Sequence, residues 1–118
     1  MEELEFKIKR AEVRVILESE EGEKTAYLLR ELTGKQRDDY QKTVAKQIKP
    51  DKEGVPTNLA GMAGLRSQLL ILSIVKEQGL ESVSLDVVDG LPASVHESLY
   101  LKCVELSGLG AEGELGND

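Results

Sequence analysis

Apolar residues near the start of the chain follow the period of β-strands. Leu4–Lys9 (LEFKIK) places an apolar side chain at every second position, which is typical of a half-buried strand. Val13–Leu17 is rich in β-branched residues, and Thr25–Arg30 follows it after a glycine-containing turn signal at 20–24. Two strands around such a short loop predict an antiparallel β-hairpin.

After the hairpin the apolar period changes to that of an α-helix. Thr33 and Gln36 form a capping-box pattern, so a helix is predicted over about 35–48. One side of this helix carries an apolar stripe with a spacing of four residues. The stripe consists of Tyr40, Val44 and Ile48.

A loop containing proline and glycine over 49–57 precedes a longer helix, predicted over about 59–78. Asn58 is its candidate N-cap and Gly79 its C-terminal stop. Gly61 and Gly64 each cost about 1 kcal/mol relative to alanine inside a helix. Either the helix begins after these glycines, or they allow another backbone to approach closely.

The last third of the chain predicts a strand over Ser82–Asp89, a turn, and a final helix over about 93–106 opened by Pro92. Its core stripe consists of Val95, Leu99, Cys103 and Leu106. The sequence thus predicts an α+β fold: an N-terminal β-hairpin, as a small antiparallel sheet, packed with about three α-helices. Residues 1–107 form this single domain, and 108–118 a flexible, acidic, glycine-rich tail.

Composition narrows the function classes. The chain has 118 residues, a net charge of −7 and 3% aromatic residues. Acidic charge and few aromatic rings argue against nucleic acid and anionic membranes as partners. A single cysteine and the lack of an apolar signal region predict a reducing, cytoplasmic location.

Few residues are candidates for chemistry. His96 lies near Ser94, but both fall on one predicted helical turn and point in different directions, so an exposed helix residue is expected. Cys103 lies on the core stripe, which predicts a buried, unreactive thiol. Asp86 and Asp89 lack the remaining ligands of a calcium loop. We therefore predict no catalytic, cofactor or metal site, and no enzymatic activity.

The second half of the predicted 59–78 helix is apolar around most of its circumference. Such a helix is buried on all sides. Either its own subunit covers it, or one flank is covered by another subunit or a partner. The candidate protein-binding residues are Leu69, Leu70, Ile71, Leu72, Ile74 and Val75.

Three segments resemble phage tail assembly chaperones of long-tailed phages and prophages. LRELTGKQRDDYQ (29–41) resembles their helix opening after a strand, and LRSQLLILSIVKEQG (65–79) their central apolar helix. DGLPASVHESLYLKCVELSGL (89–109) resembles their closing helix and its cap. The resemblance covers about 13–109.

This resemblance implies a non-enzymatic protein, α+β or mainly helical, that acts in the cytoplasm of the host bacterium without a cofactor. Members self-associate and coat the tape measure protein, so that tail tube protein polymerises around it; tail tube protein is thus a second candidate partner. In the family a frameshifted longer form can carry a further domain, whereas this sequence ends at Asp118. The alternative is a structural tail or head-completion protein that is retained in the virion.

Overall fold

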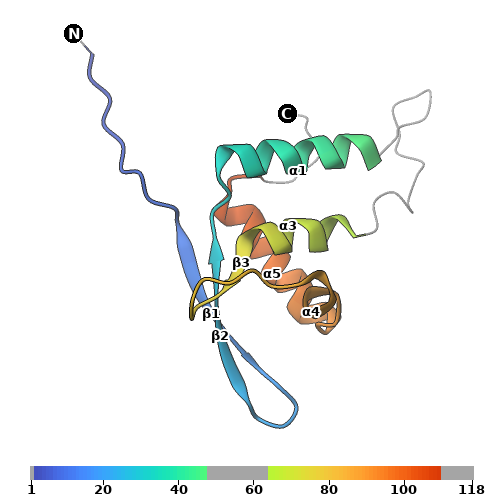
Figure 1. Ribbon diagram of the computed structural model, residues 1–118. Coiled ribbons are helices and arrows are strands. Elements are labelled where there is room, and N and C mark those ends of the chain that lie inside the picture. The colour runs from blue at the N-terminus through green and yellow to red at the C-terminus, as the bar shows by residue number, and fades with distance from the viewer. Residues whose placement is uncertain (1, 48–63, 110–118) are drawn as a thin grey trace.

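The computed structural model describes residues 2–47 and 64–109, which form an α+β fold (Figure 1). A three-stranded antiparallel sheet, in the order β1-β2-β3, packs with the helices, so the predicted fold class is confirmed. The described elements are β1 (Glu12–Glu18), β2 (Lys24–Arg30), α1 (Gly34–Gln47), α3 (Leu65–Ser73), β3 (Ile74–Lys76), α4 (Leu85–Asp89) and α5 (Ala93–Leu106).

The predicted hairpin is present as β1 and β2. The two strands are antiparallel, and their register places Val15 opposite Tyr27. Gly22 has a φ of 88° in the connecting turn, a backbone conformation that glycine adopts without steric cost. Its N–H donates to the carbonyl of Ser19 at 2.9 Å. The turn glycine and the strand-forming residues on either side of it are close in sequence, so local signals were sufficient to predict the hairpin.

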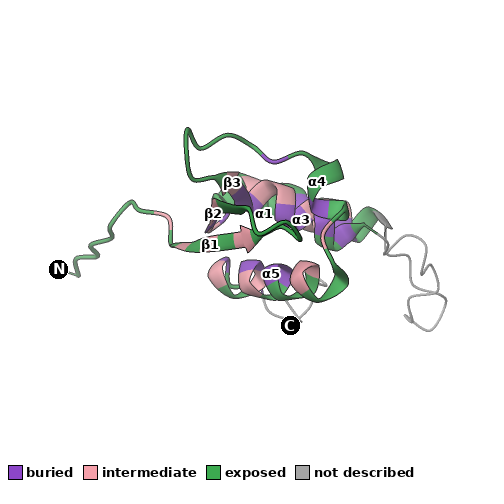
Figure 2. Cartoon of the chain, turned by 90° about the horizontal axis from the view of Figure 1, so that it is seen from below, coloured by how far each residue is buried: buried purple, intermediate pink, exposed green. Residues whose placement is uncertain are grey.

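The strand predicted over Leu4–Lys9 is wrong. Residues 2–10, which we call the N-terminal arm, belong to no strand and extend away from the body of the molecule (Figure 2). β2 ends at Arg30 and the chain then enters α1, so β2 offers the arm no strand to pair with. The alternating pattern is present, but no described strand of the same subunit pairs with the arm.

Helix α1 begins as the capping box predicts. The N–H of Gln36 donates to Thr33 Oγ1 at 3.2 Å, and the N–H of Thr33 donates to Gln36 Oε1 at 3.0 Å. Each side chain thereby satisfies a backbone donor that the helix itself cannot satisfy. Tyr40 and Val44 are buried as predicted, whereas Ile48 lies outside the described residues.

The long central helix ends earlier than predicted. α3 stops at Ser73, and the next three residues form β3, which pairs with β2 so that Val75 lies opposite Leu28. β-Branched Ile74 and Val75 suit a strand, and the edge of β2 pairs their backbone. Gly79 therefore ends no helix; it has a φ of 78° after β3. The predicted start at 59–63 lies outside the described residues.

The strand predicted over Ser82–Asp89 is also wrong. Only Ser82 makes a strand contact, an isolated bridge to Val75. The following residues form the short helix α4, in which Ser84 is the N-cap and its side chain accepts a hydrogen bond from the N–H of Val87. The Ser84 cap was a helix signal that the run of apolar residues concealed.

Helix α5 has the predicted bounds, with Pro92 as its N-cap. It ends in a Schellman motif: the N–H of Leu109 donates to the carbonyl of Val104 at 3.0 Å, and Gly108 has a φ of 65°. Leu109 is buried in the core, so the packed structure extends two residues beyond the predicted boundary at 107. The rest of the predicted tail, 110–118, lies outside the described residues.

The core gathers around α3, which contacts α1, α4, α5 and the sheet. Several core residues are almost fully buried, and they come from strands as well as helices (Figure 2). They include Leu29, Leu69, Leu70, Ile74, Val88 and Cys103. The hydroxyl of Ser73 donates to the carbonyl of Arg30 at 2.6 Å, which ties the end of α3 to β2.

Candidate protein-binding site

The structure divides the six predicted binding residues into two sets. Leu69, Leu70 and Ile74 are buried by their own subunit, so they present no surface to a partner. The other three are half-buried: Ile71, Leu72 and Val75. Cover by its own subunit, one of the two interpretations of this apolar segment, therefore holds for three of the six residues. Binding through the half-buried residues stays a prediction.

Large apolar side chains are more exposed on the N-terminal arm than on this segment. Leu4, Phe6 and Ile8 have exposed fractions of 71%, 81% and 105%. They alternate with charged residues, as the residues on one side of an extended strand do, and we call these three side chains the apolar face of the arm. The sequence signal for this face was present in the alternation of Leu4–Lys9, but it was interpreted as a half-buried strand.

A second apolar surface lies where the hairpin turn meets the beginning of α5. Leu17 and Tyr27 from the hairpin, together with Val87, Leu91 and Pro92, line an open groove of about 360 Å³. We call it the hairpin–α4 groove. Its apolar lining comes from segments about 60 residues apart in the chain, so no local pattern could have predicted it.

The hairpin–α4 groove is acidic at the hairpin turn. Glu18, Glu20 and Glu23 belong to its lining, and no lysine or arginine does among the described residues. An apolar floor with a one-sided negative charge favours a polypeptide that combines apolar and basic side chains. The groove is too open to isolate a small molecule from water, since such ligands are usually bound in clefts that bury most of their surface.

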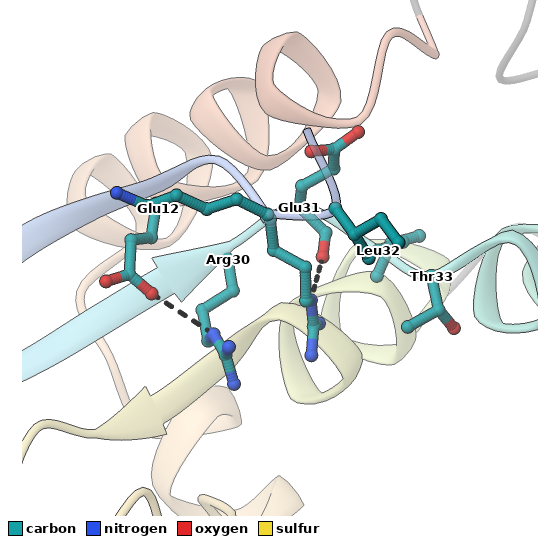
Figure 3. A pocket seen from close by; sticks show the side chains of 8 residues that line it. Glu12, Arg30, Glu31, Leu32 and Thr33 are labelled. Atoms are coloured by element: carbon teal, nitrogen blue, oxygen red, sulfur yellow. Dashed lines mark hydrogen bonds and ion pairs between the residues drawn. The ribbon is translucent and has the colours of Figure 1, made fainter. Parts of the chain in front are cut away.

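A hollow of about 630 Å³ lies at the base of the arm (Figure 3). Two of its charged side chains have partners within the protein: Arg10 Nε donates to the carbonyl of Glu31 at 2.7 Å, and Arg30 Nε lies 3.2 Å from Glu12 Oε2. Burial, followed by repulsion from Arg30, lowers the pKa of the Arg10 guanidinium. The Arg10 contact anchors the base of the arm beside the end of β2.

The structure brings His96 to a serine that the sequence analysis did not consider. Ser67 Oγ lies 2.5 Å from Asp89 Oδ1, to which it donates, and 2.8 Å from His96 Nε2. Ser94, the predicted neighbour, is exposed. Residues from α3, α4 and α5 therefore meet at one buried hydroxyl.

The order of these three groups differs from that of a catalytic triad. In a triad, histidine lies between serine and aspartate and takes the serine proton. Here the Ser67 hydroxyl lies between the other two groups, and its proton is directed to Asp89 and not to His96. Ser67 is only 3% exposed, which denies a substrate access to its oxygen. The arrangement fixes three helices relative to one another and activates no nucleophile.

Cys103 is buried as predicted, and its thiol is protonated at neutral pH. Burial raises its pKa from 9.0 to about 11, and a hydrogen bond with Ser73 opposes this shift only in part. A thiol needs a lowered pKa and exposure to react as a nucleophile. Cys103 has neither, so it acts as a small apolar core residue.

Neither metal-binding groups, nor membrane-spanning helices, nor known relatives assign a function to the described part of the chain. No group of three or more metal-binding side chains occurs within 2–47 and 64–109, and no helix in these ranges is long and apolar enough to cross a membrane. No protein family, curated protein or solved structure matches the chain. The functional proposal therefore depends on the surfaces described above and on the resemblance of the three sequence segments.

Proposed function

We propose that this protein is a phage tail assembly chaperone that binds the tape measure protein during tail assembly. The observation that carries the protein-binding part is the hairpin–α4 groove, with its apolar floor and its acidic end. The identity of the partner comes from the three segments that resemble the family. The same resemblance implies tail tube protein as a second partner.

Local structure supports the resemblance in the first and last of these segments, whereas in the middle one the helix ends at Ser73 and a strand follows. The first segment opens a helix after a strand through the Thr33–Gln36 capping box. The last segment is a helix opened by Pro92 and closed at Gly108.

The chemistry of the groove suits reversible binding of a polypeptide. Val87 is 47% exposed at the groove, so a partner that covers it gains apolar burial without unfolding the subunit. At about 25 cal/mol per Å² of apolar surface, a small groove supplies useful affinity that remains reversible after the cost of association. A chaperone requires this reversibility because it must leave the finished assembly.

Replacing Val87 by glutamate tests the groove directly. The tape measure protein of the same phage or prophage would be co-expressed with the wild-type chain or the variant, and co-purification and solubility would be measured. We expect Val87→Glu to weaken binding by at least about tenfold, because it places a charge on the apolar floor. Binding should also weaken as salt is raised, since the acidic end of the groove contributes through exposed charges.

Leu101→Glu is the matched control. Leu101 is 58% exposed on α5 and does not line the groove, so this variant loses a similar apolar side chain elsewhere. If both variants bind the tape measure protein like wild type, the groove is not the site. If the wild-type chain neither binds the protein nor keeps it soluble, the chaperone proposal itself is wrong.

Mass spectrometry of purified virions distinguishes the alternative function. A chaperone should be absent from finished tails, whereas a structural tail or head-completion protein should be present in a fixed ratio to other virion proteins. The exposed apolar arm also suits a structural subunit, because permanent interfaces bury such surfaces.

A further inference from the structure

The arm carries the features of a β-strand without a ladder. Its apolar face and its charged residues alternate, and the apolar side chains are 71% to 105% exposed. One bend interrupts it, where the N–H of Lys9 donates to the carbonyl of Lys7 at 3.0 Å. An exposed segment with this alternation is suited to being added as a strand to the edge of a sheet.

The same chain provides an open sheet edge. The order β1-β2-β3 makes β1 an outer strand, and nothing in 2–47 or 64–109 pairs with its far side. The carbonyl of Ala11 bonds toward β2 by accepting from Glu31, and the N–H of Ser19 does so by donating to Glu23. Because bonding alternates along an antiparallel strand, the intervening backbone groups face outward. They belong to Glu12, Arg14, Ile16 and Glu18.

The arm does not fold back onto the β1 of its own subunit. That would need a tight turn at Arg10 and Ala11, where hairpins favour glycine, asparagine or aspartate. Both residues are instead held beside the end of β2: Arg10 Nε donates to the carbonyl of Glu31 at 2.7 Å, and the N–H of Ala11 donates to Glu31 Oε1 at 3.0 Å. The fold-back register would also place Lys7 opposite Arg14, and opposed like charges destabilise a strand pair.

We propose that the arm of one copy of this chain adds to the open β1 edge of a second copy as a parallel β-strand. In one register the apolar face of the arm continues the half-buried side of β1. The pairs are Leu4 beside Val13, Phe6 beside Val15, and Ile8 beside Leu17. On the other side of the sheet, Glu5 then lies beside Arg14 and Lys9 beside Glu18 as opposite charges. Glu3 lies beside Glu12 as a like-charge pair where the added strand begins.

Direct pairing of two β1 edges is less favourable than the arm–edge contact. In the symmetric antiparallel arrangement centred on Val15, Glu12 of each copy lies opposite Glu18 of the other. This arrangement has two like-charge pairs and no opposite-charge pair, whereas the arm–edge register has two opposite-charge pairs and one like-charge pair. Both arms also keep their apolar faces in water. The arm–edge contact instead covers the arm and bonds the outward-facing backbone groups of β1, which otherwise present a template for aggregation.

Two variants separate the halves of the contact. Phe6→Glu disables the arm, whose Phe6 is 81% exposed, and leaves the edge intact. Ile16→Pro disables the edge: the N–H of Ile16 faces outward, so proline removes no β1–β2 hydrogen bond but blocks the added strand. Sedimentation velocity over a wide concentration range would measure self-association, and circular dichroism would check folding. If Ile16→Pro fails to fold, Val13→Lys replaces it, because an inward-facing charge also protects an edge.

The wild-type chain should self-associate, and each variant should raise the dissociation constant at least about tenfold. An equimolar mixture of the two variants should recover a dimer, because the arm of the Ile16→Pro chain meets the edge of the Phe6→Glu chain. Leu101→Glu, which alters an exposed apolar residue on α5, should associate like wild type.

Three outcomes would overturn the proposal. A wild-type chain that stays monomeric at high concentration has no such contact. Association that survives Phe6→Glu belongs to another surface, such as the two β1 edges. A mixture that fails to recover a dimer shows that the arm and the edge are not partners. Val87→Glu should not alter self-association, so failure here is distinguishable from failure of the proposed groove.

Discussion

Two short apolar segments of this chain have opposite environments. In the central segment, Leu69 and Leu70 are 0% exposed and Ile74 is 2% exposed. On the N-terminal arm, Leu4, Phe6 and Ile8 are all more than two-thirds exposed at 71%, 81% and 105%. The sequence of the first segment predicted either cover by its own subunit or binding to a partner, and that of the second predicted a half-buried strand. The structure exposes the second segment.

The difference lies in what the rest of the chain places around each segment. α3 is contacted by three other helices and by the sheet, which together bury Leu69 and Leu70 completely and leave Ile71 and Leu72 half-buried. The arm joins the sheet at the N-terminal end of β1, beside the point where β2 ends and the chain continues toward α1 (Figure 1). Apolar character therefore shows that a surface needs cover, but the surrounding fold decides whether the cover is internal or comes from a partner.

The largest expected contrast is between two alanine substitutions. Leu70→Ala should lower the free energy of unfolding by about 2–5 kcal/mol, because it removes buried methyl groups and leaves a cavity. Phe6→Ala should change it by no more than about 0.5 kcal/mol, because the side chain is exposed. Urea denaturation, at concentrations low enough to keep the chain monomeric, measures both. A large loss for Phe6→Ala would show that the arm packs on its own subunit and would remove the contrast.

The buried thiol provides the next contrast. Burial raises the pKa of Cys103 from 9.0 to about 11. Folding thus favours the protonated thiol, and this contribution is fully present below about pH 9 and is lost as pH rises toward about 11. A difference of about two pKa units corresponds to a free energy of unfolding on the order of 3 kcal/mol. Unfolding experiments across this range should show a steeper loss for wild type than for Cys103→Ala.

A thiol on the arm completes this test. In Phe6→Cys the new thiol is exposed and should react with a maleimide at the rate of a free cysteine, whereas Cys103 should react only after unfolding. Rapid labelling of Cys103 in the native wild-type chain would contradict its burial. Identical pH dependence of wild type and Cys103→Ala would contradict the raised pKa.

Local signals predicted some of this fold and could not have predicted the rest. The hairpin turn, the Thr33–Gln36 capping box and the Pro92-opened helix depend on residues close in sequence, and all three are present. β3 was missed because the apolar run of α3 continues past Ser73 into Ile74 and Val75. Helix α3 ends at Ser73 because the next residues pair with β2, which is distant in sequence. The Ser82–Asp89 segment was missed because its apolar residues outweighed the Ser84 cap.

The candidate sites show the same division. The arm alternates visibly in the sequence, but its exposure depends on the missing ladder partner. The hairpin–α4 groove joins Leu17 and Tyr27 to Val87 and Leu91 only after folding. Ser67 and His96 likewise meet through the packing of α3 against α5. Properties that require distant segments to meet were therefore beyond the sequence pattern.

The smallest expected effect concerns the polar contact inside the packed region. Ser67→Ala removes the hydroxyl that joins Asp89 and His96, and should lower the free energy of unfolding by about 1 kcal/mol. The loss is modest because Asp89 is exposed and His96 half-buried, so water can reach the groups left behind. Ser94→Ala, at an exposed position on the same helix as His96, is the matched control and should leave stability unchanged. If Ser67→Ala matches this control, the buried hydroxyl contributes no net stability, and apolar packing alone distinguishes the helical region from the arm.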